Sequence, residues 1–415
     1  MVSTLELAVR ETAPPDWDAF AEQHPQASLY HLSGWSELAR EVFGHRTLFV
    51  EARDPTGALR GILPVIRQRS WLLGNFATSM AFFNYGGAVT DDALVAERMM
   101  CRAAEAAEAL GCRYLEFRDV QPRRGNWSLR TDKITLQLEL PDTFEALAKR
   151  LGAKLRAQVK RAEREAVQCR RGGAELLDDF YAVFAENMRD LGTPVYPKRF
   201  FRAILERFPS CCELMIIDWR GEAAAAAFLA FWRDRAEVPW ASCRAQAKPM
   251  GLNMKLYWEL LARSIERGCA RFDFGRSSID SGTYRFKRQW GAEPLPLYWY
   301  RWERYPRGAA EPQGEEKGRA LQLATSVWQR LPLSLAKRSV PSSAEHCPGE
   351  RPEANGPARR GAHDRPHRAP HLAMAPARRP RRPDVSPGAA AGFPGAQNGA
   401  AGDVCVPRDA RSASD

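Results

Sequence analysis

The sequence contains few of the patterns that mark metal centres, disulfide frameworks or membrane spans. Its nine cysteines include no CxxC pair, so we expect neither a zinc ribbon nor a disulfide scaffold and interpret the cysteines as reduced thiols. No window reaches the roughly 18 consecutive apolar residues that a membrane span needs. No basic head precedes an apolar run at the N-terminus. We therefore expect a cytoplasmic protein with no membrane span.

Histidine is also scarce in most of the chain. Only His24, His31 and His45 precede residue 337, and the other four histidines lie at irregular spacing near the C-terminus. The sequence offers no spacing typical of a Ser/His/Asp triad, a Cys/His pair or a metal cluster. We expect no metal site and no bound cofactor.

Large hydrophobic residues almost disappear at the C-terminal end. Residues 337–415 hold 12 prolines, one leucine and 13 basic against 8 acidic residues, which leaves a net charge of +6 for the rest of the chain. Such a segment cannot bury enough apolar surface to offset its ordering entropy. We predict a disordered tail over 337–415, after a terminal segment over 306–336. A frameshift in a GC-rich gene would also encode this mixture of Arg, Pro, Ala and Gly.

The remaining chain contains a repeated pattern. Residues 103–119 read as a helix that stops at Gly111 before a short strand, and residues 260–277 repeat this with Gly268. A strand pair precedes each copy and turns at residues 55–57 in the first and 220–222 in the second. The pattern predicts an α/β (α+β) fold of two tandem units over residues 1–146 and 172–305, with mixed sheets flanked by helices and with Glu116 equivalent to Asp273.

Residues 147–171 are predicted to form a basic helix that links the two units. Its cations Arg156, Lys160 and Arg164 recur at i, i+4 spacing and so share one helical face. This face is either simply solvated or an electrostatic landing surface for phosphates.

The repeated unit resembles the GNAT N-acyltransferase fold. GNAT proteins commonly carry R/Q-x-x-G-x-G/A between a strand and a helix, and its amides hold the pyrophosphate of an acyl-CoA. The corresponding turn here begins at Lys248, has Gly251 at the first glycine and Asn253 at the last small residue. Pro249 removes one amide donor. The resemblance implies that Lys248, Gly251 and Asn253 bind the donor.

Several longer strings resemble the FemAB family: PQASLYHLSGW, FGHRTLFVEA, AFFNYGG, LGTPVYPKRFF, and DFGRSS followed by FKRQWGAEPLPLYW. FemAB proteins transfer aminoacyl or other acyl groups to amines of cell-envelope precursors. The strings, within residues 17–300, look in particular like the FemAB-like proteins associated with the exosortase/PEP-CTERM system of exopolysaccharide-producing bacteria. The resemblance implies an N-acyltransferase with a small-molecule or lipid-linked glycan acceptor. Its donor would be an acyl-CoA, an acyl carrier protein or an aminoacyl-tRNA.

Residues 272–294, FDFGRSSIDSGTYRFKRQWGAEP, carry the residues to which we assign the chemistry. Lys287 matches the Phe-Lys motif of the family, whose Lys is thought to stabilise charge in the transition state; otherwise it is a surface cation. Arg276 either clamps a phosphate or carboxylate of a substrate or forms a salt bridge to Asp273. Further substrate- or donor-binding candidates are Gly275, Gly282, Thr283, Tyr284 and Phe286.

A general base is expected on a strand, because GNAT enzymes often use a strand Glu through water. Glu237 and Asp273 are the two candidates. In the first unit, Asn84 and Tyr85, with two glycines after them, either form a turn or face a groove between the units.

An alternative to an enzyme is a non-catalytic binding module, in which a decayed GNAT pair recognises an anionic glycan precursor or a partner protein. The modest charge outside the tail and the lack of a nucleic-acid-binding motif predict no DNA partner, and a tRNA would enter only as the donor. Peripheral membrane contact is compatible with the sequence.

Overall fold

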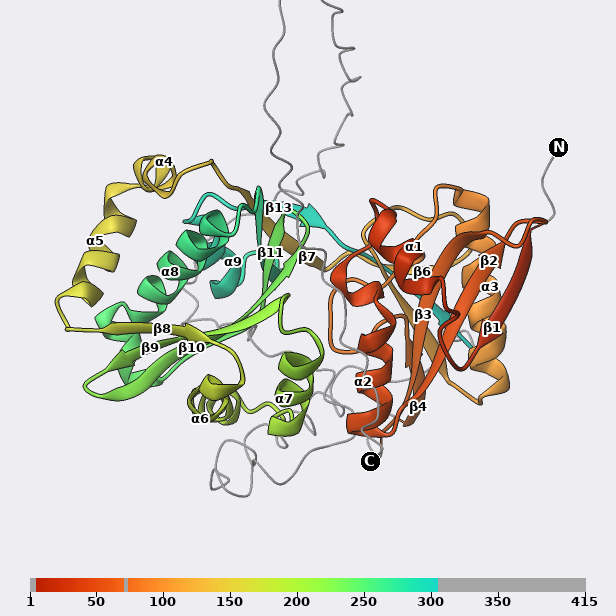
Figure 1. Ribbon diagram of the computed structural model, residues 1–415, viewed down its shortest axis with the longest axis horizontal. Coiled ribbons are helices and arrows are strands. Elements are labelled where there is room, and N and C mark those ends of the chain that lie inside the picture. The colour runs from red at the N-terminus through yellow and green to blue at the C-terminus, as the bar shows by residue number, and fades with distance from the viewer. Residues whose placement is uncertain (1–4, 71–73, 305–415) are drawn as a thin grey trace, which may run out of the picture. The chain divides into compact units, whose positions relative to one another are not determined.

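A computed structural model describes residues 5–70 and 74–304 of the chain (Figure 1). The predicted terminal segment over 306–336 and the predicted tail over 337–415 lie outside the described residues. Within the described ranges, no helix is both long enough and apolar enough to cross a membrane.

The first sheet has seven strands in the order β1-β2-β3-β4-β5-β14-β6. They are β1 (Glu6–Arg10), β2 (Arg46–Arg53), β3 (Leu59–Ser70), β4 (Gly74–Thr78), β5 (Tyr114–Asp119), β6 (Ser128–Arg130) and β14 (Tyr298–Glu303). β4 and β5 pair in parallel, and the other neighbours are antiparallel.

The second sheet also has seven strands, in the order β13-β7-β12-β11-β10-β9-β8. They are β7 (Lys133–Glu139), β8 (Gln168–Gly172), β9 (Cys212–Trp219), β10 (Glu222–Trp232), β11 (Arg235–Cys243), β12 (Arg271–Ser278) and β13 (Glu293–Pro296). Its parallel pair is β11 and β12. From the β8 edge, this sheet repeats the order and the pairing directions of the first sheet, which confirms the predicted tandem fold.

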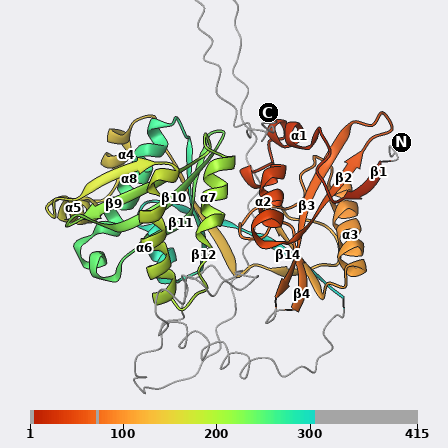
Figure 2. The ribbon, with the colours of Figure 1, turned by 60° about the horizontal axis from the view of Figure 1, so that its bottom comes forward.

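Each sheet contains one strand from the other part of the chain. β7 precedes the linking segment but lies in the second sheet, and β14 follows the second unit but lies in the first sheet (Figure 2). The predicted boundaries at residues 146 and 172 place these strands in the opposite units. The local sequence pattern marks a strand but does not show which distant strand will pair with it.

The helices pack on the faces of the sheets (Figure 1). They are α1 (Trp17–Gln23), α2 (Ser33–Phe43), α3 (Ala93–Ala109), α4 (Phe144–Arg150), α5 (Ala153–Glu163), α6 (Leu177–Asp190), α7 (Lys198–Arg207), α8 (Leu252–Glu266) and α9 (Gly282–Arg288), with short 3₁₀ helices η1 (Leu29–His31), η2 (Ala174–Leu176) and η3 (Ala245–Met250). α3 and α8 are equivalent, and the glycine that follows each, Gly111 or Gly268, adopts a left-handed conformation.

The segment between the two units differs from the predicted single helix over 147–171. It forms α4, α5 and β8, because Leu151 has an extended backbone after α4. Arg156 donates hydrogen bonds to the Ala148 and Leu151 carbonyls at 3.0 and 2.7 Å and so caps the end of α4. Lys160 and Arg164 are exposed. Arg156, one of the three cations of the predicted basic face, therefore has a structural role.

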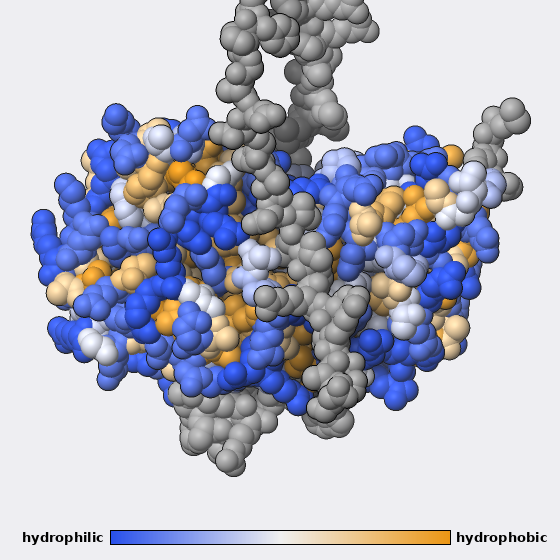
Figure 3. Space-filling view, viewed as in Figure 1, coloured by the Kyte–Doolittle hydropathy of each residue, from blue (hydrophilic) through white to orange (hydrophobic). Residues whose placement is uncertain are grey.

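The interior contains three hydrophobic clusters. Two of them lie between a sheet and a helix: one between the first sheet and α3, and the other between the second sheet and α8. The third joins α1 and α2 of the first unit to α6 and α7 of the second, where Trp35 stacks on Phe208 with ring centroids 4.6 Å apart. The visible surface carries mostly hydrophilic side chains, with hydrophobic residues in scattered patches (Figure 3). The third cluster therefore joins the two units through apolar contacts.

Candidate functional site

The parallel strands β11 and β12 separate part-way along their length. They are paired over Arg235–Glu237 and Arg271–Asp273 only, although β11 continues to Cys243 and β12 to Ser278. Beyond Asp273 the β12 ladder with β7 contains a bulge, in which Gly275 has φ +74°. Only glycine adopts this conformation readily. The two strands thus diverge immediately after Glu237 and Asp273, which lie opposite each other.

Asp273 is fully buried and accepts four hydrogen bonds. The donors are the Tyr85 hydroxyl, the Thr135 hydroxyl at 2.7 Å, the Gln137 amide at 2.9 Å and the Gly275 backbone N–H at 2.7 Å. With these donors its lone pairs are occupied, so a proton from a substrate would have to displace one of them. This arrangement suits a positioning residue better than a general base.

Glu237 differs from its neighbour because it lines a cavity. Burial, and then the negative charge of Asp273, raise the pKa of Glu237 to about 8. Tyr30 lies next to the carboxyl group, although its hydroxyl makes no aligned hydrogen bond. A carboxyl group whose pKa lies near the working pH can both accept and release a proton, which is the requirement for a general base.

The cavity beside Glu237 is very small, about 20 Å³, which is room for about one water molecule. Its lining comes from both units and consists of Ser28, Leu29, Tyr85, Ala230, Phe231, Trp232, Arg235 and Glu237. A substrate group of any size would therefore meet Glu237 from the strand divergence rather than inside this cavity.

Lys287 lies on the short helix α9 (Gly282–Arg288). The Ser281 side chain caps this helix by accepting from the Tyr284 N–H at 3.1 Å. Lys287 is buried, and its Nζ donates to the Gly275 and Arg276 carbonyls at 2.9 and 2.8 Å. The lysine thus supports the bulge at which β12 leaves β11, and the alternative of a surface cation is wrong.

Arg276 makes no salt bridge to Asp273 in the described part of the chain, so that interpretation is also wrong. Asp273 is occupied by its four donors, and the guanidinium instead lies 5.0 Å from the ring centroid of Trp299. Arg118 and Arg130 lie 4.7 and 5.9 Å from the same ring. Both of these arginines pair with Glu116, at 3.2 and 3.5 Å, so Arg276 is the arginine of this group that suits an anionic group of a substrate.

The other predicted residues of this segment have local packing roles. Phe286 packs against Tyr257 at 4.9 Å, and Tyr284 contacts the same core. The Thr283 hydroxyl lies 2.9 Å from that of Ser281. Gly282 has an ordinary φ, and a Cβ there would meet nothing within 4 Å. No close approach of the backbone therefore requires glycine at residue 282.

The turn predicted to bind pyrophosphate connects β11 to α8. Gly251 begins α8 with φ +83° and provides no side-chain cap, so no side chain competes for the amides of the first turn. Lys248 is exposed and Asn253 is half-buried, with its N–H beside the Cys243 thiol. A Cβ on Gly251 would lie 2.8 Å from the Gln158 carbonyl of α5. The turn retains an open helix N-terminus, but α5 approaches it closely.

The glycine loop of the first unit does reach the second unit. Tyr85 donates to Asp273, and the Asn84 side chain lies about 4.0 Å from the position of a Cβ on Gly275. A Cβ on Gly86 would lie 2.2 Å from Met80, and one on Gly87 would lie 2.3 Å from Asp119. The glycines are therefore needed for packing, and the loop delivers Tyr85 to the site.

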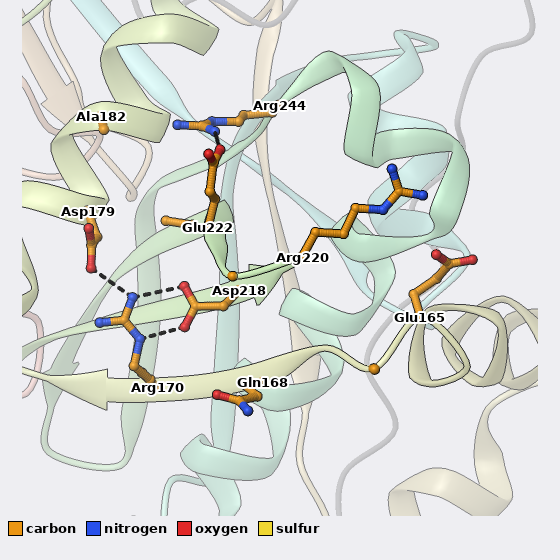
Figure 4. A pocket seen from close by; sticks show the side chains of 12 residues that line it. Glu165, Gln168, Arg170, Asp179, Ala182, Asp218, Arg220, Glu222 and Arg244 are labelled. Carbon is orange, nitrogen blue, oxygen red and sulfur yellow. Dashed lines mark hydrogen bonds and ion pairs between the residues drawn. The ribbon is translucent and has the colours of Figure 1, made fainter.

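A larger cavity, of about 820 Å³, lies elsewhere on the second unit, over β8, β9 and α6 (Figure 4). Its charged side chains largely neutralise one another. Arg170 pairs with Asp218 at 2.6 Å and Asp179 at 2.7 Å, and Arg244 pairs with Glu222 at 3.1 Å. The cavity lies away from the divergence of β11 and β12, so we do not place the site there.

Sequence reasoning missed Tyr30, Thr135, Gln137 and Trp299. Thr135 and Gln137 alternate with Ile134, Leu136 and Leu138 along β7, so a polar face on a half-buried strand was visible in the sequence. Tyr30 and Trp299 reach the site only through contacts between distant segments. No local pattern indicates such contacts.

Comparison with known proteins supports the fold. Residues 149–288 match the family model described as an acetyltransferase (GNAT) domain. No curated protein matches the sequence. The crystal structure of FemX is similar with a TM-score of 0.56 and 13% identity, over 71% of this chain and 97% of that one.

Two other structures are similar at lower TM-scores. The structure of L-PGS from Bacillus licheniformis has 15% identity and a TM-score of 0.48, over 78% of this chain and 99% of that one. A tandem GNAT protein from the clavulanic acid biosynthesis pathway has 11% identity and a TM-score of 0.47, over 73% and 100%. The similarity to FemX shows that the two proteins share a fold. The residues that match the GNAT model include Glu237, Asp273 and Lys287.

Proposed function

We propose that the protein is a FemAB-like N-acyltransferase, which transfers an acyl or aminoacyl group to an amine of a cell-envelope or exopolysaccharide precursor. The observation that carries the proposal is the position of Glu237. This buried carboxyl group has a pKa of about 8, lines a cavity and lies where β11 and β12 diverge. The sequence strings that look like exosortase-associated FemAB proteins suggest the exopolysaccharide context.

In this proposal the acceptor amine and the acyl carbonyl meet at the strand divergence, beside the small cavity that Glu237 lines. The Glu237 carboxylate accepts the proton that the amine loses as its nitrogen bonds to the acyl carbon. The leaving group departs with the bonding electron pair and is protonated by the Glu237 acid or by solvent. Asp273 holds Tyr85 at this site by accepting its hydroxyl hydrogen bond, and the charge of Asp273 acts on Glu237.

Lys287 is proposed to stabilise the negative charge that develops on the carbonyl oxygen. Its ammonium is fixed at the bulge by two carbonyls, so it needs little reorganisation during the reaction. Arg276 is proposed to bind an anionic group of the donor or acceptor, since its guanidinium has no carboxylate partner in the described ranges. The open N-terminus of α8 suits the phosphates of the donor.

The test compares cells that contain, lack or carry a variant of the gene. Mass spectrometry of exopolysaccharide and lipid-linked precursors should show an acyl or aminoacyl mass that disappears with the gene. The wild-type gene should restore this mass and Glu237→Gln should not. A mass that Glu237→Gln restores fully would contradict the proposed reaction. A mass that never depends on the gene would favour a non-catalytic binding module.

A further inference from the structure

The outer face of α5 carries cations that have no partner in the described part of the chain. Residues 153–164, which are the helix and its C-terminal cap, hold five cations and one acid. Four of the cations are exposed and form no ion pair within the described ranges: Lys154, Lys160, Arg161 and Arg164. The acid, Glu163, pairs with Lys255 of α8 at 3.0 Å. The exposed face of α5 therefore keeps its positive charge.

The four cations lie on the side of α5 that faces away from the protein. The opposite side packs on α8 through its buried residues Leu155, Val159 and Ala162. Lys154, Arg161 and Arg164 lie within about 80° of one another around the helix axis and extend over about 15 Å, with Lys160 next to them. In both views of the ribbon, α5 lies at the outside of the second unit (Figures 1 and 2). The charged face is therefore open to a large partner.

The stability of the helix alone does not explain this distribution of charge. Lys160 and Arg161 lie in the last turn, where the helix dipole favours cations. The same dipole disfavours Lys154, which lies in the first turn. Lys160 and Arg164 are four residues apart and repel each other. The pattern thus costs the isolated helix some stability and suits an anionic partner outside the described part of the chain.

We propose that this face of α5 docks the protein on the anionic surface of a lipid bilayer. Clusters of Lys and Arg on a helix bind such surfaces, because each charge is attracted to the anionic head groups. The other exposed residues of the helix are Ala153, Ala157 and Glu163, so no large apolar side chain inserts and the binding is electrostatic. A lipid surface is favoured over RNA because this face presents no aromatic side chain on which a base could stack.

Docking through α5 brings the proposed donor turn close to the membrane. The Gln158 carbonyl of α5 lies 2.8 Å from the position of a Cβ on Gly251, which begins α8. A precursor that is anchored in the lipid would then meet the protein on the side of the open α8 N-terminus. The inference goes beyond the proposed acyl transfer and does not rest on it, because membrane docking requires no reaction.

Vesicle co-sedimentation tests the proposal with the full-length protein. Vesicles of phosphatidylcholine are compared with vesicles that also contain about one third phosphatidylglycerol, an anionic lipid. At about 0.1 M NaCl, wild type should bind the vesicles with phosphatidylglycerol and not those of phosphatidylcholine alone. It should dissociate at about 1 M NaCl, because the Debye length falls from about 10 Å to about 3 Å.

A combined variant assigns the binding to α5. Lys154→Gln/Lys160→Gln/Arg161→Gln/Arg164→Gln should weaken binding to the anionic vesicles by roughly 100-fold or more, since each cation near an anionic surface contributes about fivefold. Circular dichroism checks that the variant is folded. Every variant keeps residues 337–415 with their 13 basic residues, so the contribution of this segment cancels in the comparison.

The matched control removes the same charge from other elements. Four arginines outside α5 are exposed and form no ion pair within the described ranges: Arg40, Arg113, Arg124 and Arg202. The combined variant Arg40→Gln/Arg113→Gln/Arg124→Gln/Arg202→Gln should bind the anionic vesicles within about fivefold of wild type, because only cations close to the lipid surface contribute strongly.

Equal binding by the α5 variant and the control variant would overturn the proposal. Wild type that does not distinguish the two kinds of vesicle would overturn it as well. Binding of bulk tRNA is measured in parallel with the same proteins. Wild type that binds tRNA but not the anionic vesicles, together with loss of tRNA binding in the α5 variant, would also overturn the proposal and assign the face to an RNA.

Discussion

The two units have the same strand order but place different chemistry at the same position. In the first sheet the last residue pair of the parallel strands is Thr78 and Glu116, and in the second it is Glu237 and Asp273. Both pairs directly precede the point where the strands separate. The duplication therefore offers an internal comparison between two copies of one site.

The carboxyl group of the first unit is neutralised by arginines. Glu116 lies 3.2 Å from Arg118, 3.2 Å from Arg301 and 3.5 Å from Arg130. Burial alone raises its pKa, but the charges of these arginines bring the pKa below its usual value. Its neighbour Thr78 donates to Gln68 at 3.2 Å. This copy holds a permanent charge in an ion-pair cluster, which is a structural role.

In the second unit the buried carboxyl group of Glu237 keeps a raised pKa and access to a cavity. The helices that follow the two sites, α3 and α8, also differ in how their N-termini are capped. The Asp92 side chain caps α3 by accepting from the Leu94 N–H at 2.8 Å, whereas Gly251 leaves the N-terminus of α8 uncapped. An acidic cap repels phosphates and an open terminus attracts them. We infer that only the second unit retained the chemistry.

The largest expected effects come from replacing Glu237 or Glu116 by glutamine. Glu237→Gln should lower turnover by about 10² to 10⁴, the usual contribution of a general base. In wild type, turnover should rise as pH increases to about 8, because the base must be ionised, and this limb should vanish in the variant. Steady-state kinetics over a range of pH measures both the loss of turnover and its pH dependence.

Glu116→Gln is the matched change in the first unit. It should lower the free energy of unfolding by roughly 3 kcal/mol, because it leaves buried arginines without their counter-charge. Folded Glu116→Gln should keep turnover within a few-fold of wild type. Chemical denaturation and kinetics on the same sample check this. Equal losses of turnover in both variants would remove the distinction between the two units.

Lys287→Ala should lower turnover by about 10² to 10³, the typical loss for one group that stabilises an oxyanion. Lys287→Arg should recover only part of it, since a planar fork cannot occupy the place of an ammonium. Because Lys287 also supports the β12 bulge, thermal denaturation must show that each variant is folded under assay conditions. Unchanged turnover in folded Lys287→Ala would leave the residue a purely structural role.

Gly87→Ala should lower the free energy of unfolding by roughly 1–3 kcal/mol, because the new Cβ would overlap Asp119 and displace the loop that carries Tyr85. Gly282→Ala is the control. Its φ is ordinary and its surroundings are open, so its stability should change by less than about 0.5 kcal/mol. Urea denaturation compares them, and similar stabilities would show that the loop tolerates a Cβ.

Arg276→Ala should have the smallest effect. It should raise the apparent KM about tenfold and leave kcat within a few-fold, if the guanidinium binds an anion equally in the ground and transition states. Kinetics with the identified donor and acceptor measure this split. A decrease in kcat with constant KM would instead place Arg276 in transition-state stabilisation.

Much of the fold could be predicted because its signals are local. Turns at residues 55–57 and 220–222, together with Gly111 and Gly268, give two identical orders of elements, and the structure confirms them. The exchange of β7 and β14 could not be predicted, because both strands satisfy the same alternating pattern whichever sheet they join.

The site was only partly accessible to sequence reasoning. Glu237 and Asp273 were identified as acids on strands, but the sequence could not separate their roles. Their difference arises from Thr135 and Gln137, which donate to Asp273 from a strand more than 130 residues away.

The central claim is that Glu237 titrates near pH 8 while Glu116, the buried carboxyl group of the first unit, stays ionised. The most direct measurement is a pH titration of side-chain carboxyl ¹³C signals by NMR, with Glu237→Gln and Glu116→Gln used to assign the two signals. We predict that the Glu237 signal has a midpoint near pH 8 and that the Glu116 signal has a midpoint below that of an ordinary glutamate. A Glu237 midpoint at or below an ordinary value of about 4.3 would contradict its role as the base and the distinction between the units.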